Sequence, residues 1–339
     1  MPSPNRPTRA DIERRVGSMD QMAGIRPYSV EDGPGRGARA LHVHTGSGLE
    51  FAALPDRALD ILDFRYNGRS LCWHSGVGPA SPDRFDPHGK GWLRSFFGGM
   101  LTTCGLSNAG APSEDGGEAF GLHGRISNAS ASNVRWGAEW AGDDYALWIS
   151  GETREASALG RRLVLRRHIS TAFGSNTVVI EDTVENEGFS EEPFMLLYHV
   201  NAGYPLLDEG AIVRIDSEFE GYDEHARAGV AAWNQVEPPE SGIPEKVFIH
   251  DVRPDADGFA KAELYNPALN LGFRVRWRKA ELPNLWQWKM LGDRDYVMGL
   301  EPGNCGPGGR AAARVANATG ILPPRGFVCH RVELEAFEE

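Results

Sequence analysis

Two residues of the chain have side chains and neighbours suited to acid–base catalysis. His199 directly follows the apolar run Leu196–Tyr198, and Glu301 directly follows Tyr296–Leu300. Glycine, proline or asparagine comes soon after each, which predicts that both residues lie at strand ends. An imidazole and a carboxyl have ordinary pKa values of ~6.5 and ~4.3. If the fold brings them together, the pair can move protons on a neutral substrate without a metal or a cofactor.

Two further segments are too polar for an ordinary core strand. Arg57 stands between Asp56 and Asp60. This pattern is typical either of a local ion-pair cluster or of a guanidinium held rigid to bind sugar hydroxyls or a carboxylate. His123 has glycines close by and is followed by Arg125, so a ligand could approach its ring closely. A purely structural histidine is the alternative.

The segment Trp286–Lys289 places two indole rings beside a cation. Sugars present C–H faces that pack on aromatic rings while their hydroxyls stay free for hydrogen bonds. Trp286, Trp288 and Lys289 are therefore candidates for carbohydrate binding, and a strand with one buried and one exposed tryptophan is the alternative. The Gly- and Thr-rich segment 96–108 lacks the Walker spacing, so we expect a buried loop that lines a pocket.

Signs of a metal site are weak. His123, His199 and Glu301 could share one ion, but their separations are not those of ligands on one strand or helix. The cysteines are Cys72, Cys104, Cys305 and Cys329. They are widely separated and form no C-x-x-C pair, which is typical of reduced thiols. We expect no metal, no cofactor and a cytoplasmic location.

Composition disfavours several classes of protein. A net charge of −12 over 339 residues repels phosphate polymers, so nucleic acid is not an expected partner. No run of about 18 apolar residues is present, and we expect no membrane segment. A hydrophobic content of 41% supports a folded core. The expected partner is a small molecule, and a homodimer is left open.

Frequent glycine and proline indicate many short strands with tight turns. The expected strands cover residues 38–44, 49–54, 133–140, 145–152, 159–170, 177–186, 194–198, 211–215, 259–265, 271–277, 296–300 and 327–336. One short helix is expected at 11–17, with Thr8 or Asp11 as its cap. No repeat or change of composition marks a boundary. The prediction is a single all-β domain over residues 1–339, with a short N-terminal extension of about residues 1–20.

Six segments together resemble the aldose 1-epimerase (galactose mutarotase-like) superfamily, and more narrowly its bacterial DUF4432 branch. They are Asp32-Gly33 with Gly35-Arg36-Gly37, Leu54-Pro55-Asp56-Arg57 with Leu59-Asp60-Ile61, Gly98-Gly99 with Leu101-Thr102-Thr103-Cys104-Gly105-Leu106, Leu122-His123-Gly124-Arg125-Ile126, Tyr198-His199-Val200-Asn201, and Leu300-Glu301-Pro302. These segments follow the order of the superfamily along the chain. An arginine comes first, then a His-Gly, then a histidine with asparagine two residues later, and last a C-terminal glutamate.

The resemblance implies one large antiparallel β-supersandwich with a carbohydrate cleft on a concave sheet. By position, Glu301 matches the general base and His199 the general acid, while His123 and Arg57 match residues that bind the sugar; Asn201 belongs to the same motif as His199. The chain departs from the superfamily in having Arg125 in place of a second glycine after His-Gly. Val200 and Ala202 also replace an aromatic pair, and Asp223 is the candidate for a sugar-binding aspartate.

The predicted function is that of an isomerase, an aldose 1-epimerase that interconverts sugar anomers through Glu301 and His199. The predicted sugar contacts are Arg57, His123, Arg125, Asn201, Trp288 and Lys289. Two alternatives stay open. The first is a keto-sugar epimerase, isomerase or lyase on the same fold, with or without a metal; the second is a carbohydrate-binding protein without turnover.

Overall fold

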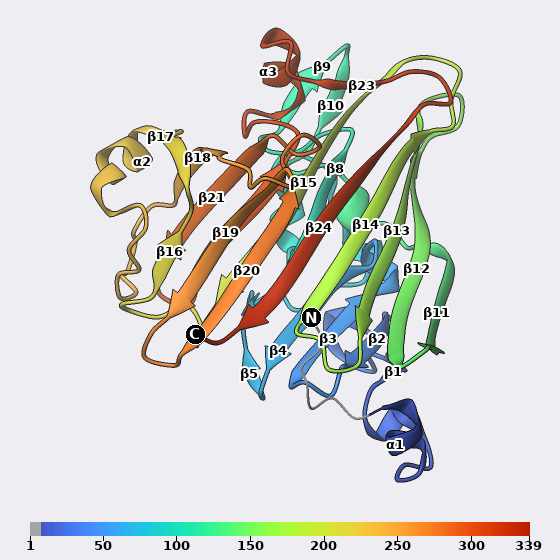
Figure 1. Cartoon of the computed structure of the whole chain (residues 1–339). Coiled ribbons are helices and arrows are strands. Elements are labelled where there is room, and N and C mark those ends of the chain that lie inside the picture. The colour runs from blue at the N-terminus through green and yellow to red at the C-terminus, as the bar shows by residue number, and fades with distance from the viewer. Residues whose placement is uncertain (1–7) are drawn as a thin grey trace.

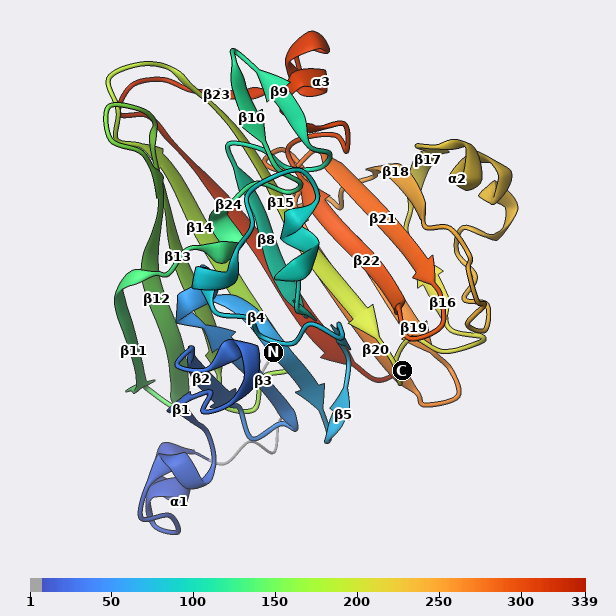
Figure 2. The same cartoon turned by 180° about the vertical axis from the view of Figure 1, so that it is seen from behind.

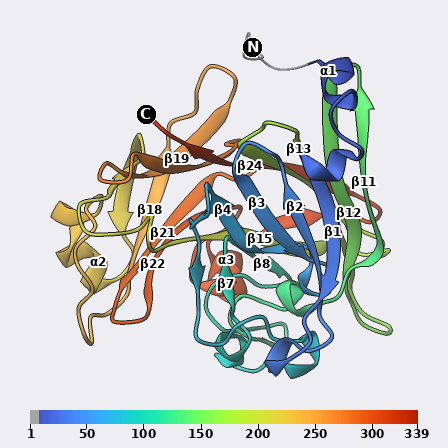
Figure 3. The same cartoon turned by 90° about the horizontal axis from the view of Figure 1, so that it is seen from below.

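Most of the chain folds into antiparallel β-strands, which confirms the all-β prediction. The computed structural model describes residues 8–339. It contains a 12-stranded and an 8-stranded sheet that pack against each other (Figure 1). In the view from below, the teal loops lie on the side of the larger sheet that faces away from the smaller one (Figure 3).

Four of the six segments that resemble the superfamily contain residues of the larger sheet, whereas residues 32–37 and 122–126 lie outside its strands. Its order is β1 (Gly24–Ser29), β2 (Arg39–His44), β3 (Leu49–Leu54), β4 (Asp60–Tyr66), β8 (Leu101–Leu106), β15 (Glu192–Gly203), β22 (Tyr296–Gly303), β21 (Asn284–Leu291), β18 (Lys246–Val252) and β17 (Ser217–Gly221), with β5 (Arg69–Ser70) beside β4 and β23 (Gly320–Leu322) beside β15. Strands β8, β15, β22 and β21 are adjacent at its centre (Figure 2).

The smaller sheet has the order β11 (Ser132–Ala141), β12 (Asp144–Ala156), β13 (Arg162–Ala172), β14 (Thr177–Asn186), β24 (Phe327–Phe337), β20 (Leu271–Arg278), β19 (Phe259–Asn266) and β16 (Ile212–Arg214). Two small ladders pair β6 (Trp73–His74) with β7 (Gly98–Gly99), and β9 (Ser113–Asp115) with β10 (Glu118–Phe120). The helices are α1 (Arg9–Glu13), α2 (Glu224–Ala228) and α3 (Gly309–Val315), with short 3₁₀ turns at Met19–Gln21, Gly33–Gly35, Pro55–Arg57, Pro82–Arg84, Gly91–Arg94, Ile126–Asn128 and Val230–Ala232.

The predicted N-terminal helix forms, but it ends at Glu13 rather than at residue 17 and begins at Arg9 rather than at Asp11. The reason is a capping box, in which the Thr8 hydroxyl accepts from the Asp11 amide and the Asp11 carboxylate accepts from the Thr8 amide. Ile12 is buried. Of the predicted extension at residues 1–20, residues 1–7 lie outside the described part of the chain.

The central strand β15 is buried on both faces, which explains its nearly continuous apolar run. Side chains alternate along a strand. Leu196, Tyr198 and Val200 belong to the main core, which contains residues of both sheets. Leu197 belongs instead to a second cluster on the outer face of the large sheet, and His199 shares that face. One strand therefore serves both the core and the site.

A buried polar network joins the two sheets behind this strand. Arg167 of the smaller sheet makes a bidentate ion pair with Asp182 (2.9 and 2.7 Å) and also reaches Asp60 of β4 (3.1 Å). The Tyr198 hydroxyl donates to Asp182 (2.7 Å), and Thr103 donates its amide and hydroxyl to Asp60. A charged arginine is tolerated here because both carboxylates compensate it. The network fixes β4, β8 and β15 relative to the smaller sheet.

Candidate active site

The sheet register places the two predicted catalytic residues side by side. Between β15 and β22, Leu197 pairs with Gly303 and Asn201 pairs with Gly299. His199 therefore stands opposite Glu301, on the same face of the sheet. The distance between His199 Nδ1 and Glu301 Oε1 is 3.3 Å. Residues about a hundred positions apart thus form one close acid–base pair.

Neither residue lies at a strand end, and that prediction was wrong. β15 continues to Gly203 and β22 to Gly303. Proline at position 302 does not end its strand, because Pro302 still pairs in register with Leu285 of β21. The consequence is functional: both side chains project from the interior of a paired sheet, which holds them more firmly than a loop would.

Gly299 makes room for the carboxylate. It lies two residues before Glu301 on the same face of β22, opposite Trp288. A Cβ atom at Gly299 would lie 2.1 Å from Glu301 Oε1 and 2.9 Å from Trp288 Cβ. Glycine is therefore needed at this position for the carboxylate to occupy its place.

The pair opens into a cavity of about 560 Å³ on the outer face of the large sheet. That volume lies within the range of small-molecule sites. The cavity is lined by Trp73, Ser75, Gly76, Val77, Lys90, Trp92, Leu93, Phe96, Gly110, Ala111, Pro112, Leu122, His123, His199, Tyr222, Asp223, Glu245, Val247, Trp286, Trp288, Met290, Asp295, Glu301 and Pro307. Its walls come from β6, β21, β22 and several loops, so it forms only in the complete fold.

Aromatic rings surround the His199 imidazole. Ring centroids lie 5.1 Å away for Phe96, 5.3 Å for Trp288 and 6.1 Å for Trp92. Trp286 stands opposite Glu301 on β21, and its indole N–H donates to the Cys305 carbonyl. Both tryptophans of the Trp286–Lys289 segment therefore line the cavity.

Burial opposes charge on both members of the pair. It lowers the pKa of His199 to about 3, while the side chain of Asn201 acts in the opposite sense. Burial, together with the negative charge of Glu245, raises the pKa of Glu301 well above its ordinary value. Burial therefore favours a neutral imidazole beside a protonated carboxyl.

His123 also lies at the cavity, as a neighbour of His199. The two imidazole centroids are 5.3 Å apart, and Nδ1 of His123 faces the Gly110 amide at 3.4 Å. Its backbone has a φ of 57°, in the left-handed region. The adjacent Gly124 has no space for a Cβ, since the Gly105 carbonyl would be 2.3 Å away. The glycine beside His123 is thus required by backbone packing.

Arg57 and Asn201 lie near the site but do not line the cavity. Arg57 is buried, and its guanidinium donates to the carbonyls of Ser127, Ala80 and Ser95. The Asn201 amide donates to the carbonyls of Gly99 (3.2 Å) and His199 (2.9 Å). In this geometry both residues brace the backbone around the site, because their donors already have protein acceptors.

Arg125 and Lys289 are not brought to the cavity either. Arg125 is exposed. Lys289 neighbours Trp288 on β21 and therefore projects from the opposite face. Its ammonium donates to the carbonyls of Ala232 and Gln235 (both 2.8 Å) and pairs with Glu237 at 2.6 Å. Lys289 therefore anchors the loop between β17 and β18, and its ammonium does not face the cavity.

Several cavity residues were missed by the sequence analysis. Trp73, Trp92 and Lys90 come from segments without a strong local pattern, and Glu245 lies in a loop before β18. Asp223 does line the cavity, but its carboxylate also caps α2 by accepting from the Ala226 amide at 2.7 Å.

The fold is that of the galactose mutarotase-like β-sandwiches. A Klebsiella pneumoniae structure described as a proposed aldose 1-epimerase is similar, with a TM-score of 0.90, 24% identity, and coverage of 95% of this chain and 86% of that one. A galactose mutarotase-like protein from Clostridium acetobutylicum has a TM-score of 0.66, 13% identity and coverage of 94% and 100%. Galactose 1-epimerase from Lactobacillus acidophilus has a TM-score of 0.59, 12% identity and coverage of 93% and 99%.

The chain belongs to the DUF4432 family, a domain of unknown function, whose model matches residues 35–336. This confirms the family resemblance found in the sequence. A comparison with curated proteins finds no match. Within residues 8–339, no helix has the length and apolar character needed to cross a membrane.

Proposed function

We propose that this protein is an aldose 1-epimerase, in which Glu301 and His199 interconvert the anomers of a free sugar. The observation that carries the proposal is the contact of 3.3 Å between His199 Nδ1 and Glu301 Oε1 at an aromatic cavity. Nδ1 and Oε1 are buried and, among the described residues, have no polar partner besides each other, so we propose that a proton passes between them. The remaining atoms, Nε2 and Oε2, are then the ones that reach the sugar.

The reaction begins when the shared proton moves from Glu301 to Nδ1 of His199, which gives a carboxylate and an imidazolium. The carboxylate takes the proton of the anomeric hydroxyl, and the electrons of that O–H bond form the carbonyl. The bond between C1 and the ring oxygen breaks, and its electrons take the proton from Nε2 of His199. Rotation of the aldehyde and the reverse steps close the ring as the other anomer.

Burial favours the neutral pair, which is the state both before the first proton transfer and after ring opening. After the step Glu301 is protonated and His199 is neutral, which is the charge state favoured by the pKa directions of both groups. The imidazolium–carboxylate pair of the first step is therefore the state that burial disfavours. The two groups act as a unit, since Glu301 takes one proton from the sugar while His199 gives another proton back to it.

The rim of the cavity favours a neutral sugar. Asp223, Glu245 and Asp295 line the cavity together with Lys90. Carboxylates accept hydrogen bonds from sugar hydroxyls, whereas they repel an acidic or phosphorylated substrate. Arg94, a cation of the loop that also contributes Lys90 and Trp92, pairs with Asp86 at 2.7 Å. We therefore propose an unmodified aldose as the substrate.

The test is anomer exchange measured by NMR with a panel of free aldoses, acidic sugars and keto sugars. We expect catalysed exchange of at least one neutral aldose, and its loss in Glu301→Gln with an unchanged melting temperature. A new product, rather than faster anomer exchange, would instead indicate an epimerase or lyase. Binding of a sugar without any change in its exchange rate would indicate a carbohydrate-binding protein and refute the proposal.

A further inference from the structure

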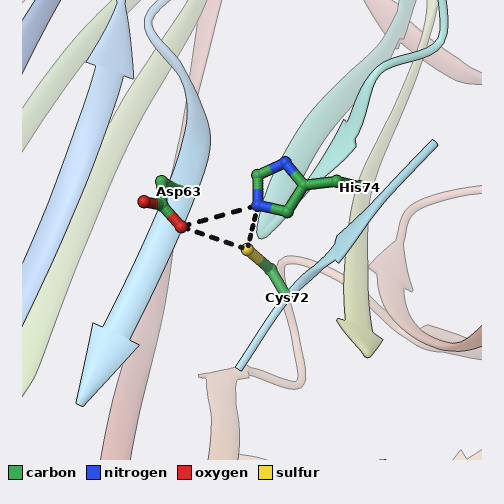
Figure 4. A group of neighbouring side chains, drawn as sticks. All are labelled: Asp63, Cys72 and His74. Atoms are coloured by element: carbon green, nitrogen blue, oxygen red, sulfur yellow. Dashed lines mark hydrogen bonds and ion pairs between the residues drawn. The ribbon is translucent and has the colours of Figure 1, made fainter. Parts of the chain in front are cut away.

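A second group of reactive side chains lies outside the cavity. Asp63 of β4 and Cys72 and His74 at β6 point toward one another (Figure 4). Nε2 of His74 is 3.5 Å from Oδ1 of Asp63 and 3.5 Å from Sγ of Cys72, and Sγ is 3.9 Å from Oδ1. The sulfur is buried, and the half-exposed imidazole borders solvent.

The separation between His74 Nε2 and Asp63 Oδ1 is too long for a strong hydrogen bond. A charge-assisted N–H···O bond has a length of about 2.7–2.9 Å. The distance from His74 Nε2 to Asp63 Oδ1 exceeds that length by more than half an ångström. One ring nitrogen also has a single proton and cannot donate fully to both neighbours. Contacts with Asp63 and Cys72 raise the pKa of His74 to about 10. An imidazolium bonded to both residues accounts for the approach of the three side chains, but not for the distances between their atoms.

The separations do fit three corners of a metal tetrahedron. With zinc bonds of about 2.3 Å to sulfur and 2.0–2.2 Å to nitrogen and oxygen, tetrahedral ligands stand about 3.3–3.5 Å apart for N···O and about 3.5–3.7 Å apart for pairs with sulfur. The N···O and S···N distances match, and the S···O distance is slightly longer. Thiolate, imidazole and carboxylate together are the ligand set of zinc rather than of magnesium or calcium.

Neighbouring residues already orient the donors. Arg65 Nε donates to Oδ2 of Asp63 at 2.7 Å, so the other carboxylate oxygen, Oδ1, turns toward the cluster. Cys72 and His74 are two residues apart on an extended segment, and their side chains share one face. This spacing was overlooked in the sequence because the third donor comes from another strand.

We propose that Asp63 Oδ1, Cys72 Sγ and His74 Nε2 bind one zinc ion, with water as the fourth ligand. The Cys72 thiol and the imidazole lose their protons to solvent when the ion binds. This departs from the expectation that the chain takes no metal. The ion would join β4 to β6, whose other residue, Trp73, lines the cavity. Its role is structural, and the proposal does not rest on the proposed sugar chemistry.

The test uses the full chain after dialysis against a chelator, followed by titration with Zn²⁺ or Co²⁺. We expect one tightly bound metal per chain, a higher melting temperature with zinc, and the near-ultraviolet absorption of thiolate-bound Co²⁺. Cys72→Ser and His74→Ala should each weaken binding by more than the ~10–100-fold cost of losing an outer-shell partner. Cys329→Ser and His88→Ala, which change an exposed cysteine and an exposed histidine elsewhere, should bind as the wild type does.

Two results would overturn the proposal. One is wild-type protein that takes up no stoichiometric zinc and shows no cobalt–thiolate absorption. The other is equal binding by the wild type and His74→Ala, a variant at a half-exposed position that is expected to fold even if Cys72→Ser does not. Metal content and absorption are read without any sugar, so failure here leaves the anomer-exchange proposal to its own test.

Discussion

Replacing Gly299 by alanine should displace the proposed catalytic base without unfolding the protein. The new Cβ would stand 2.1 Å from Glu301 Oε1, whereas ordinary contacts begin at 3.4 Å. The oxygen must therefore retreat by about 1.3 Å. Misplacement of a reacting group by about 1 Å can cost ~10²-fold in rate, which corresponds to about 2.7 kcal/mol of activation free energy.

Glu301 Oε1 is the end of a side chain and can move, whereas Trp288 Cβ, 2.9 Å from the new Cβ, is fixed to its backbone, so we expect a modest loss of stability but a folded protein. The assay is anomer exchange by NMR, with kcat measured beside the melting temperature. Gly306→Ala is the matched control, since no atom lies within 4 Å of its added Cβ. If Gly299→Ala keeps the wild-type rate, the position of Oε1 is irrelevant to turnover, and the assignment of Glu301 fails.

Three further predictions concern the pair and the buried groups around it. His199→Asn should cost at least as much activity as Glu301→Gln, and the double variant should be little worse than either; multiplicative effects would contradict a concerted pair. Tyr198→Phe should lower the free energy of unfolding by about 1.5–3 kcal/mol, because it removes a hydrogen bond to the charged Asp182; denaturant unfolding with an unchanged midpoint would count against the network. Burial lowers the pKa of His330 to about 4, so the unfolded chain binds the extra proton first and this group destabilises the fold as pH falls from ~6.5 to ~4. His330→Leu should therefore gain up to about 3 kcal/mol of unfolding free energy relative to wild type over that pH range. Parallel profiles of unfolding free energy against pH for the two proteins would show that His330 is not the group responsible.

The strands that the sequence predicted well are those whose side chains alternate simply. β14 has the predicted bounds, Thr177–Asn186. The sequence did not predict β4 and β8, because polar residues interrupt the apolar pattern of these strands as they would in a loop. Asp60 and Thr103 are buried and satisfy each other across the sheet. A local sequence pattern cannot predict a hydrogen bond between residues that lie 43 positions apart in the chain.

The candidate site shows the same division. His199 and Glu301 could be predicted, since a titratable side chain at the end of an apolar run is a strong local signal. The orientation of the Arg57 side chain could not be predicted, because it depends on three carbonyls from distant loops. For Lys289, strand alternation alone would have shown that it and Trp288 face opposite sides of β21.

The aromatic lining of the cavity gives the protein an internal optical probe. Trp73, Trp92, Trp286 and Trp288 line the cavity, which is four of the nine tryptophans in the chain. A sugar that enters must exclude water from these indoles and change the polarity around them. Intrinsic fluorescence should therefore report ligand binding without a label, and should do so even in variants of Glu301 that no longer turn the sugar over.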